Sequence, residues 1–198
     1  MKLFYRKIII TIAALCSILF FSITYSKDKD TSEKPELKFR NDGTFKIIQF
    51  ADIQDGADID KRTIALMERI LDYEKPDLVV LTGDNIDGSC KSESDVRKAI
   101  DNIAKPMETR HIPWAVVFGN HDTDHGKMSK KEMMKVYMSY PYNISQEGLS
   151  NSDRVGNYNL LIKASKGSAP AFNIYMLDSG GYLSDTKEYD WIKPNQIA

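Results

Sequence analysis

Cysteine and histidine are both scarce in this chain. Its 198 residues include only two cysteines, Cys16 and Cys90, and three histidines. Cys16 lies in an apolar N-terminal segment, so a chain that loses this segment keeps one cysteine and can form no internal disulfide. We therefore expect packing alone to hold the fold together. The histidines are His111, His121 and His125, and none follows Gly126.

The chain also lacks an excess of charge of either sign. Lys and Arg number 27 against 28 Asp and Glu, which leaves a formal net charge of -1. A protein that binds nucleic acid through its phosphates usually carries a basic excess, and we find no nucleic-acid-binding signature here. The 42% content of hydrophobic residues suffices for one globular domain with a core.

The N-terminus departs from this composition. Residues 8–25 form a run of 18 residues without a charge, preceded by Lys2, Arg6 and Lys7. A basic start followed by an apolar stretch is typical of a signal peptide or a membrane anchor. Both alternatives export the remainder to the extracellular space or the cell envelope, and the uncleaved form would keep the chain at a membrane. We expect this segment to end at residue 26, a polar linker to cover 27–36, and the domain to cover 37–198.

Apolar strands alternate with helical patterns along the domain. Asp42-Gly43 lies between two alternating segments and predicts a hairpin that enters the first core strand, and Pro106 predicts a kink or break in the second helix. Strand, helix, strand, helix, strand in this order indicates an α/β sheet covered on both faces. An antiparallel strand pair should follow. The predicted strands lie within 39–50, 77–84, 112–122, 157–164 and 171–180, and the helices within 61–76, 92–110 and 129–140.

Polar side chains follow each of the first three strands. Asp52 ends the first, Gly83-Asp84 the second, and residues 119–122, Gly-Asn-His-Asp, the third. Ligands of open α/β sheets gather at the carboxyl ends of the strands, so we expect these residues to share one rim. Carboxylate, amide and imidazole donors suit Mn, Fe or Zn. A carboxylate between two other strands could bridge two metals, an arrangement suited to phosphoryl transfer.

These segments resemble the first three blocks of the calcineurin-like metallophosphoesterases, the superfamily of the purple acid phosphatases. The matching residues are "ADIQDG", "TGDNIDG" and "FGNHD", and "NIYMLDSGGY" and "YDWIKPNQIA" are similar to the phosphatase-29-like branch. The resemblance covers roughly residues 45–196. It implies the first half of a four-layer αββα sandwich with a mixed sheet, and a hydrolase that acts on phosphate esters through two divalent or trivalent Fe, Mn or Zn ions.

The resemblance also implies roles for single residues. Asp52 would bind the first metal, Asp84 would bridge the two, and Asn120 would bind the second through its amide oxygen. His121 would contact the substrate phosphate as a catalytic residue. Asp122, the other expected catalytic residue, would orient His121.

Two departures from the family pattern affect activity. Gln54 stands where the first block has a histidine, and an amide oxygen is a poorer metal donor. The later blocks, which supply three histidine ligands, have no counterpart, so the chain is interpreted as a C-terminally truncated form with an incomplete site. The remaining His111 and His125 are interpreted as loop residues, and Met133, Met134 and Met138 as core.

Two other interpretations remain. An aspartyl-phosphate hydrolase would need a second carboxylate two residues after its nucleophile, and Asp52-Ile53-Gln54 lacks one. A non-catalytic exported or surface protein that keeps the fold without a complete metal site fits both departures. Bound-metal analysis distinguishes this alternative from an enzyme.

Overall fold

The computed structural model describes residues 33–148, 154–183, 185–186 and 188–197. The predicted leader, 1–26, and most of the linker lie outside these residues. Among the residues that are described, no helix has both the length and the apolar character needed to cross a membrane. Lys34 donates to the carbonyl oxygens of Met138 and Tyr140, so the end of the predicted linker contacts the domain.

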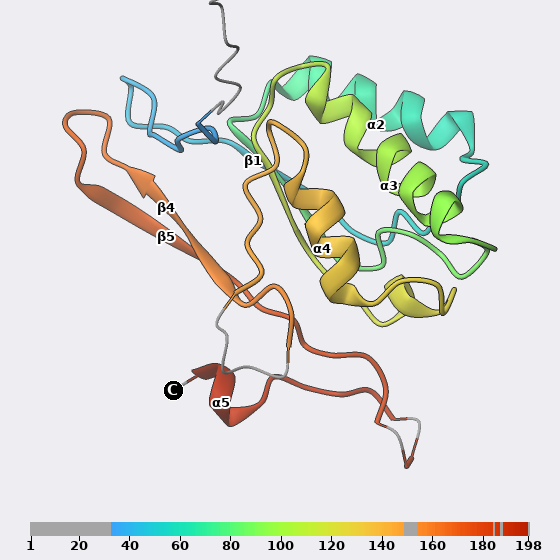
Figure 1. The fold of residues 1–198 in the computed structure, drawn as a ribbon. Helices are drawn as coiled ribbons and strands as arrows, with labels where there is room; N and C mark the ends of the chain where they lie inside the picture. Colours follow the sequence, from blue (N-terminus) through green and yellow to red (C-terminus); the bar gives the residue numbers. More distant parts are fainter. Residues whose placement is uncertain (1–32, 149–153, 184, 187, 198) are drawn as a thin grey trace, which may run out of the picture. The chain divides into compact units, whose positions relative to one another are not determined.

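The core of the domain is a parallel sheet of three strands in the order β1-β2-β3 (Figure 1). The strands are β1 (Ile47–Phe50), β2 (Leu78–Thr82) and β3 (Trp114–Val117). Val80 of β2 pairs with Gln49 on one side and Ala115 on the other. The two outer strands differ in burial: every residue of β3 is buried, whereas β1 alternates between exposed and half-buried residues.

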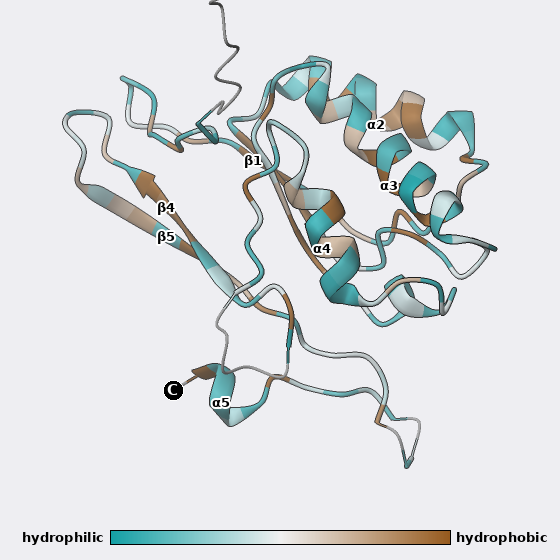
Figure 2. Ribbon diagram, viewed as in Figure 1, coloured by the Kyte–Doolittle hydropathy of each residue, from teal (hydrophilic) through white to brown (hydrophobic). Residues whose placement is uncertain are grey.

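Three helices connect and cover these strands (Figure 1). They are α2 (Lys61–Glu74), α3 (Glu93–Glu108) and α4 (Lys130–Met138). Each begins at a side chain that accepts a backbone N–H, and the caps are Asp60, Ser92 and Ser129. In α4, Ser129 and Glu132 form the expected capping box. Along the helices apolar and polar residues are interspersed, while apolar residues dominate the buried strands (Figure 2).

Pro106 does not end α3, contrary to our expectation. The helix continues to Glu108, and the Thr109 N–H donates to the Lys105 carbonyl. Proline removes one helical hydrogen bond, but Pro106 and its neighbour Met107 are buried. Burial of this apolar turn stabilises it enough to keep the chain helical for two further residues.

The last strands form a separate antiparallel pair. β4 (Tyr158–Lys163) and β5 (Pro170–Met176) pair with Leu160 opposite Ile174. The Tyr158 hydroxyl donates to the Val116 carbonyl at 2.6 Å, which ties this pair to β3. The short helix α5 (Pro194–Ile197) follows. The α/β fold class is thus confirmed, with the parallel and the antiparallel strands in two sheets among the described residues.

The turn at Asp42-Gly43 forms as expected, but its two arms diverge. Gly43 has a φ of 81°, and the Arg40 N–H donates to the Thr44 carbonyl across the turn. The segment before the turn then pairs with the end of β4, where Phe39 N donates to the Lys163 carbonyl. The turn therefore connects the two sheets instead of forming a hairpin on β1.

Candidate active site

The carboxyl ends of the parallel strands open into one pocket of about 320 Å³. Asp52, Asp84 and Asn120, the three expected metal ligands, all line it. The segment after β5 lines the opposite part with Ser179 and Gly180. The structure therefore brings the three residues to one rim, as the parallel strand order predicts. Their role as metal ligands stays a prediction.

The backbone at this rim is strained. Five non-glycine residues of the described ranges have a positive φ. Two of them, Lys75 and His111, follow helix ends, where a left-handed residue is common. The other three are Asp52 (54°), Gln54 (41°) and Asp84 (49°). A left-handed L-residue costs on the order of 1 kcal/mol, and such strain concentrates at functional sites.

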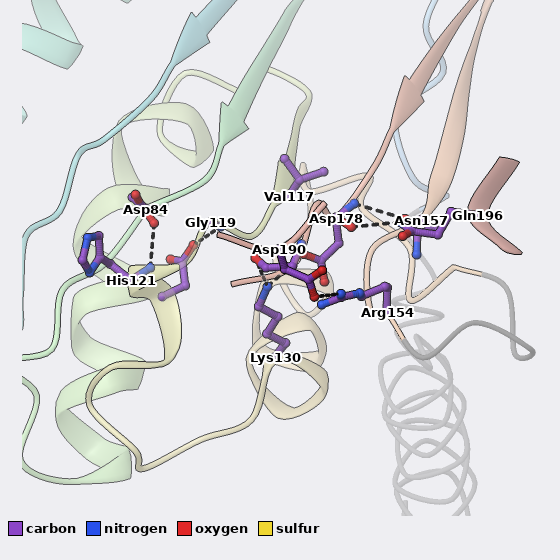
Figure 3. A network of polar contacts seen from close by, with 12 residues as sticks. Asp84, Val117, Gly119, His121, Lys130, Arg154, Asn157, Asp178, Asp190 and Gln196 are labelled. Atoms are coloured by element: carbon purple, nitrogen blue, oxygen red, sulfur yellow. Dashed lines mark hydrogen bonds and ion pairs between the residues drawn. The ribbon is translucent and has the colours of Figure 1, made fainter. Parts of the chain in front are cut away.

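The loops after β2 and β3 are in direct contact. A Cβ on Gly83 would lie 2.8 Å from the Gly119 nitrogen, and a Cβ on Gly119 would overlap Asp84. These two glycines allow the loops to approach closely. Oδ1 of Asp84 accepts the backbone N–H of His121 at 2.8 Å, as Figure 3 shows. The carboxylate of Asp84 is thereby fixed beside Asn120.

Asp122 links the same two loops but does not line the pocket. It is fully buried and accepts the backbone N–H groups of Asn85 at 2.9 Å, Ile86 at 3.1 Å and Gly119 at 2.7 Å. Burial outweighs these three donors and raises the pKa of Asp122 to about 6. This carboxyl group ties the two loops together, and its expected role in orienting His121 stays a prediction.

Asp124 makes the contact expected of Asp122. Oδ2 of Asp124 lies 2.6 Å from Nδ1 of His121, and this hydrogen bond raises the pKa of the imidazole. Both residues belong to the short turn η1 (His121–Thr123) and its cap, which places them three residues apart on one side. Nε2 is then the ring nitrogen that remains for a substrate.

The amide of Asn120 is also fixed by a neighbour. Its Nδ2 donates to the Tyr182 hydroxyl at 2.6 Å. Because the nitrogen is engaged in this bond, the oxygen is the atom that can coordinate a metal. Sequence reasoning missed both Tyr182 and Asp124. The spacing of three between His121 and Asp124 could have indicated the second, and the position of Tyr182 shortly after β5 could have indicated the first.

Two polar networks hold the segment after β5 in place (Figure 3). Asp178 is buried and accepts from Lys130 at 2.8 Å, while Asp190 pairs with Arg154 and Lys193. Gln196 bridges the residue before β4 and the segment after β5, which lie at the same end of this antiparallel pair. Its amide donates to Asn157 at 2.9 Å and to the Asp178 carbonyl at 2.8 Å. These contacts fix the far wall of the pocket.

The remaining expected residues behave as loop and core residues. His125 is buried, and its Nδ1 accepts the Lys127 N–H, which confirms a role within its own loop. His111 stacks on Tyr142 at 4.8 Å. Gln54 donates its N–H to the Asp84 carbonyl and does not line the pocket. Met133 and Met134 are in the core, and Met138 packs against it.

The donor set at the rim fits part of a metal coordination sphere. The pocket is lined by the carboxylates of Asp52 and Asp84 and the amide of Asn120, and all three can offer oxygen to a hard or borderline ion, while the third lining carboxylate, Asp190, pairs with Arg154 and Lys193. In the part of the chain that the structure describes, no group of three or more His, Cys, Asp or Glu is placed to hold a metal. A bound ion would therefore complete its coordination with water or with ligands from outside these residues.

Comparison with known proteins is consistent with this geometry. Residues 45–197 match the family model described as calcineurin-like phosphoesterase. Two similar proteins from Arabidopsis thaliana are named "Probable inactive purple acid phosphatase 14" and "Probable inactive purple acid phosphatase 29". The first is 36% identical over 81% of this chain and 47% of its own length, and the second is 34% identical over 84% and 49%.

A third similar protein is the phosphatase DCR2 of Saccharomyces cerevisiae. It is 31% identical over 90% of this chain and 34% of its own length. The chain thus spans about half the length, or less, of these curated relatives. The match of the family model covers both sheets and every loop that lines the pocket, and the chain belongs to the calcineurin-like phosphoesterase family.

Proposed function

We propose that this chain forms the metal- and phosphate-binding half of a phosphoesterase site, with weak hydrolytic activity of its own. The observation that carries the proposal is the pocket in which Asp52, Asp84 and Asn120 meet at the ends of adjacent parallel strands. The family match supports a phosphate ester as the substrate class.

Asp52 and Asp84 would hold Mn, Fe or Zn ions, together with Oδ1 of Asn120. Such ions, when bound, lower the pKa of water and neutralise phosphate charge. Asp84 keeps its place through the His121 N–H, and Asn120 keeps its orientation through Tyr182. These contacts position the donors before any ligand arrives.

His121 would stabilise the phosphate charge and donate a proton to the leaving oxygen. Asp124 raises the pKa of its ring and so favours the protonated form that both roles require. With Nδ1 held by Asp124, the proton donor is Nε2. The ring is half-exposed, which leaves it accessible to a substrate.

Turnover by this chain should be low. The three proposed ligands, Asp52, Asp84 and Asn120, leave much of the coordination to water, so ion affinity and position are both loosely defined. A loss of about 1.4 kcal/mol of transition-state stabilisation lowers the rate tenfold. The names of the two Arabidopsis relatives contain the word "inactive", which supports the same expectation.

A second candidate is a non-catalytic protein that keeps the fold. It is favoured by the absence, among the described residues, of any group of three His, Cys, Asp or Glu that could hold an ion. In this case the pocket would bind neither a metal nor a phosphate group with useful affinity.

We also propose that the N-terminal segment exports the chain to the extracellular space or the cell envelope. Residues 8–25 carry no charge and follow a basic start, which supports a signal peptide or an anchor. Fractionation of cells that express the full chain, followed by N-terminal sequencing, tests this. A chain that stays soluble in the cytoplasm with its N-terminus intact would contradict it.

Metal titration separates the two candidate functions. The full chain, stripped of metal, is titrated with Mn²⁺ in a calorimeter beside an Asp84→Ala variant, and both are assayed with an aryl phosphate. We expect weak Mn²⁺ binding that the substitution abolishes, with little turnover. Absence of binding in the unsubstituted chain would leave the non-catalytic interpretation. Rapid turnover that depends on Asp84 would show that this half of the site suffices.

A further inference from the structure

Two tyrosines stack beside the pocket. The rings of Tyr182 and Tyr189 have centroids 5.5 Å apart and planes inclined by 27°. They face each other across a short antiparallel bridge between the two residues. The rings of Tyr182 and His121 also meet edge-on, with centroids 6.3 Å apart. An aromatic row therefore runs outward from the expected catalytic histidine.

The backbone and side chains around this row are well anchored. The Leu183 N–H donates to the Glu188 carbonyl at 2.8 Å, and the Asp190 N–H donates to the Gly181 carbonyl at 2.9 Å. Asp190 is held in turn by Arg154 and Lys193. The Tyr182 hydroxyl accepts the Asn120 amide. The two rings are thus presented in a fixed position.

The row ends at an open ring face within the pocket. Tyr189 lines the same cavity as Asp84 and Asn120, yet 71% of its surface is exposed, against 44% for Tyr182. Packing against Tyr182 uses one face of the Tyr189 ring. The other face offers an apolar surface to whatever enters the cavity, which is otherwise lined mainly by polar groups and backbone.

We propose that the Tyr182–Tyr189 pair forms a subsite for an aromatic leaving group of the phosphate ester. This inference rests on the proposed function, since the phosphate would occupy the pocket beside Asp84 and Asn120. An aryl ring stacked on Tyr189 extends the aromatic row, and offset stacking of this kind favours the aryl ligand beyond its area burial. The geometry thus selects aryl esters over small alkyl esters of phosphate.

The test compares two phosphonates, which cannot be hydrolysed. Phenylphosphonate and methylphosphonate are titrated calorimetrically into the full chain with Mn²⁺ present. We expect phenylphosphonate to bind about five- to tenfold more tightly. Tyr189→Ala should abolish this preference, so that the two phosphonates bind equally, without changing the methylphosphonate affinity. Tyr73→Ala, which removes another exposed tyrosine, on α2 and outside the pocket, is the matched control and should keep the preference.

Each outcome bears on a different claim. If neither phosphonate binds the unsubstituted chain, the proposed phosphoesterase site is wrong, and the proposed aromatic subsite is rejected as well. If both bind equally, the site stands and the aromatic subsite is overturned. An equal loss of both affinities in Tyr189→Ala would likewise overturn it. Should Tyr189→Ala fail to fold, Tyr189→Leu removes the ring but keeps apolar bulk, and an unchanged preference in that variant rejects the proposal.

Discussion

Oδ2 of Asp124 lies 2.6 Å from Nδ1 of His121, one turn further along the chain. The hydrogen bond from Asp124 is the main cause of the raised pKa of the imidazole, and the charges of Asp84 and the fully buried Asp122 act in the same direction. The neighbouring aspartates of the Asp-Thr-Asp sequence therefore have separate tasks. Asp122 joins two loops, and Asp124 acts on the ring.

Asp124→Asn should lower the pKa of His121. An amide carries no charge and stabilises the imidazolium less, so the ring should titrate at a lower pH in the metal-free chain. The measurement is the pH dependence of the His121 ring proton signals in NMR spectra. The unsubstituted chain, recorded under the same conditions, is the control. An unchanged His121 titration would show that Asp124 does not pair with the ring in solution.

The same pair gives stability a defined dependence on pH. The pKa of His121 is higher in the folded chain than in the unfolded chain, where it is about 6.5. The contribution of this residue to folding stability is therefore fully present below the unfolded pKa and is lost as the pH rises through the folded pKa. Urea denaturation of the parent chain and of Asp124→Asn between pH 5 and pH 9, roughly the range around this pKa, should show the largest difference at the acidic end. A difference that grows with pH would contradict the assignment.

Asp122→Asn should destabilise the fold far more than Asp124→Asn. The substitution places an amide NH₂ against at least one of the three N–H donors, and a buried donor without a partner costs on the order of 1–3 kcal/mol. Urea denaturation of both variants gives the free energies of unfolding. Asp124 is partly exposed, and its variant is the matched control. Equal stabilities of the two variants would contradict the role of Asp122 as a tie.

Gly119→Ala should destabilise the fold more than Gly167→Ala. A Cβ on Gly119 would overlap Asp84, whereas a Cβ on Gly167 meets nothing within 4 Å. Gly167 does have a φ of 78°, so its alanine variant bears backbone strain on the order of 1 kcal/mol. We expect Gly119→Ala to lower the free energy of unfolding by more than this amount, as measured by thermal or urea denaturation. The variant should lose Mn²⁺ binding as well. A tolerant Gly119 would show that the two loops can separate.

Tyr182→Phe should weaken metal binding without altering the fold. Removing the hydroxyl releases the Asn120 amide, and partners that orient metal ligands affect affinity by about 10- to 100-fold. The readout is the Mn²⁺ dissociation constant from calorimetry, with Tyr189→Phe as the control because the hydroxyl that accepts the Asn120 amide belongs to Tyr182. A Tyr182→Phe variant with parental affinity would show that the hydroxyl does not position Asn120.

The order of the strands and the shared rim could be predicted from the sequence because both depend on local patterns. Continuous apolar strands separated by amphipathic helices leave few alternatives to a parallel sheet. Once the sheet is parallel, Asp52, Asp84 and Asn120 must exit on one side. The capping box at Ser129 is local as well, and it forms.

The details that sequence reasoning missed depend on tertiary contacts. Pro106 marks a helix end by its chemistry, but burial against the core keeps α3 intact. The His121 ring contacts Asp124 and not Asp122, because Asp122 lies on the side of η1 that faces the loop after β2. Tyr182 reaches Asn120 across 62 residues, and no periodicity within either segment encodes that contact.

The left-handed backbone conformations of Asp52 and Gln54 lower the stability of the fold, and at Asp52 the side chain that causes this strain also lines the pocket. Glycine adopts such angles freely, so Asp52→Gly or Gln54→Gly relieves strain that the present side chains impose. A stabilising substitution at position 52 would, however, delete an oxygen donor from the pocket. Directed evolution of this chain for heat resistance alone should therefore favour glycine at both positions, and glycine at position 52 should weaken ligand binding in the pocket.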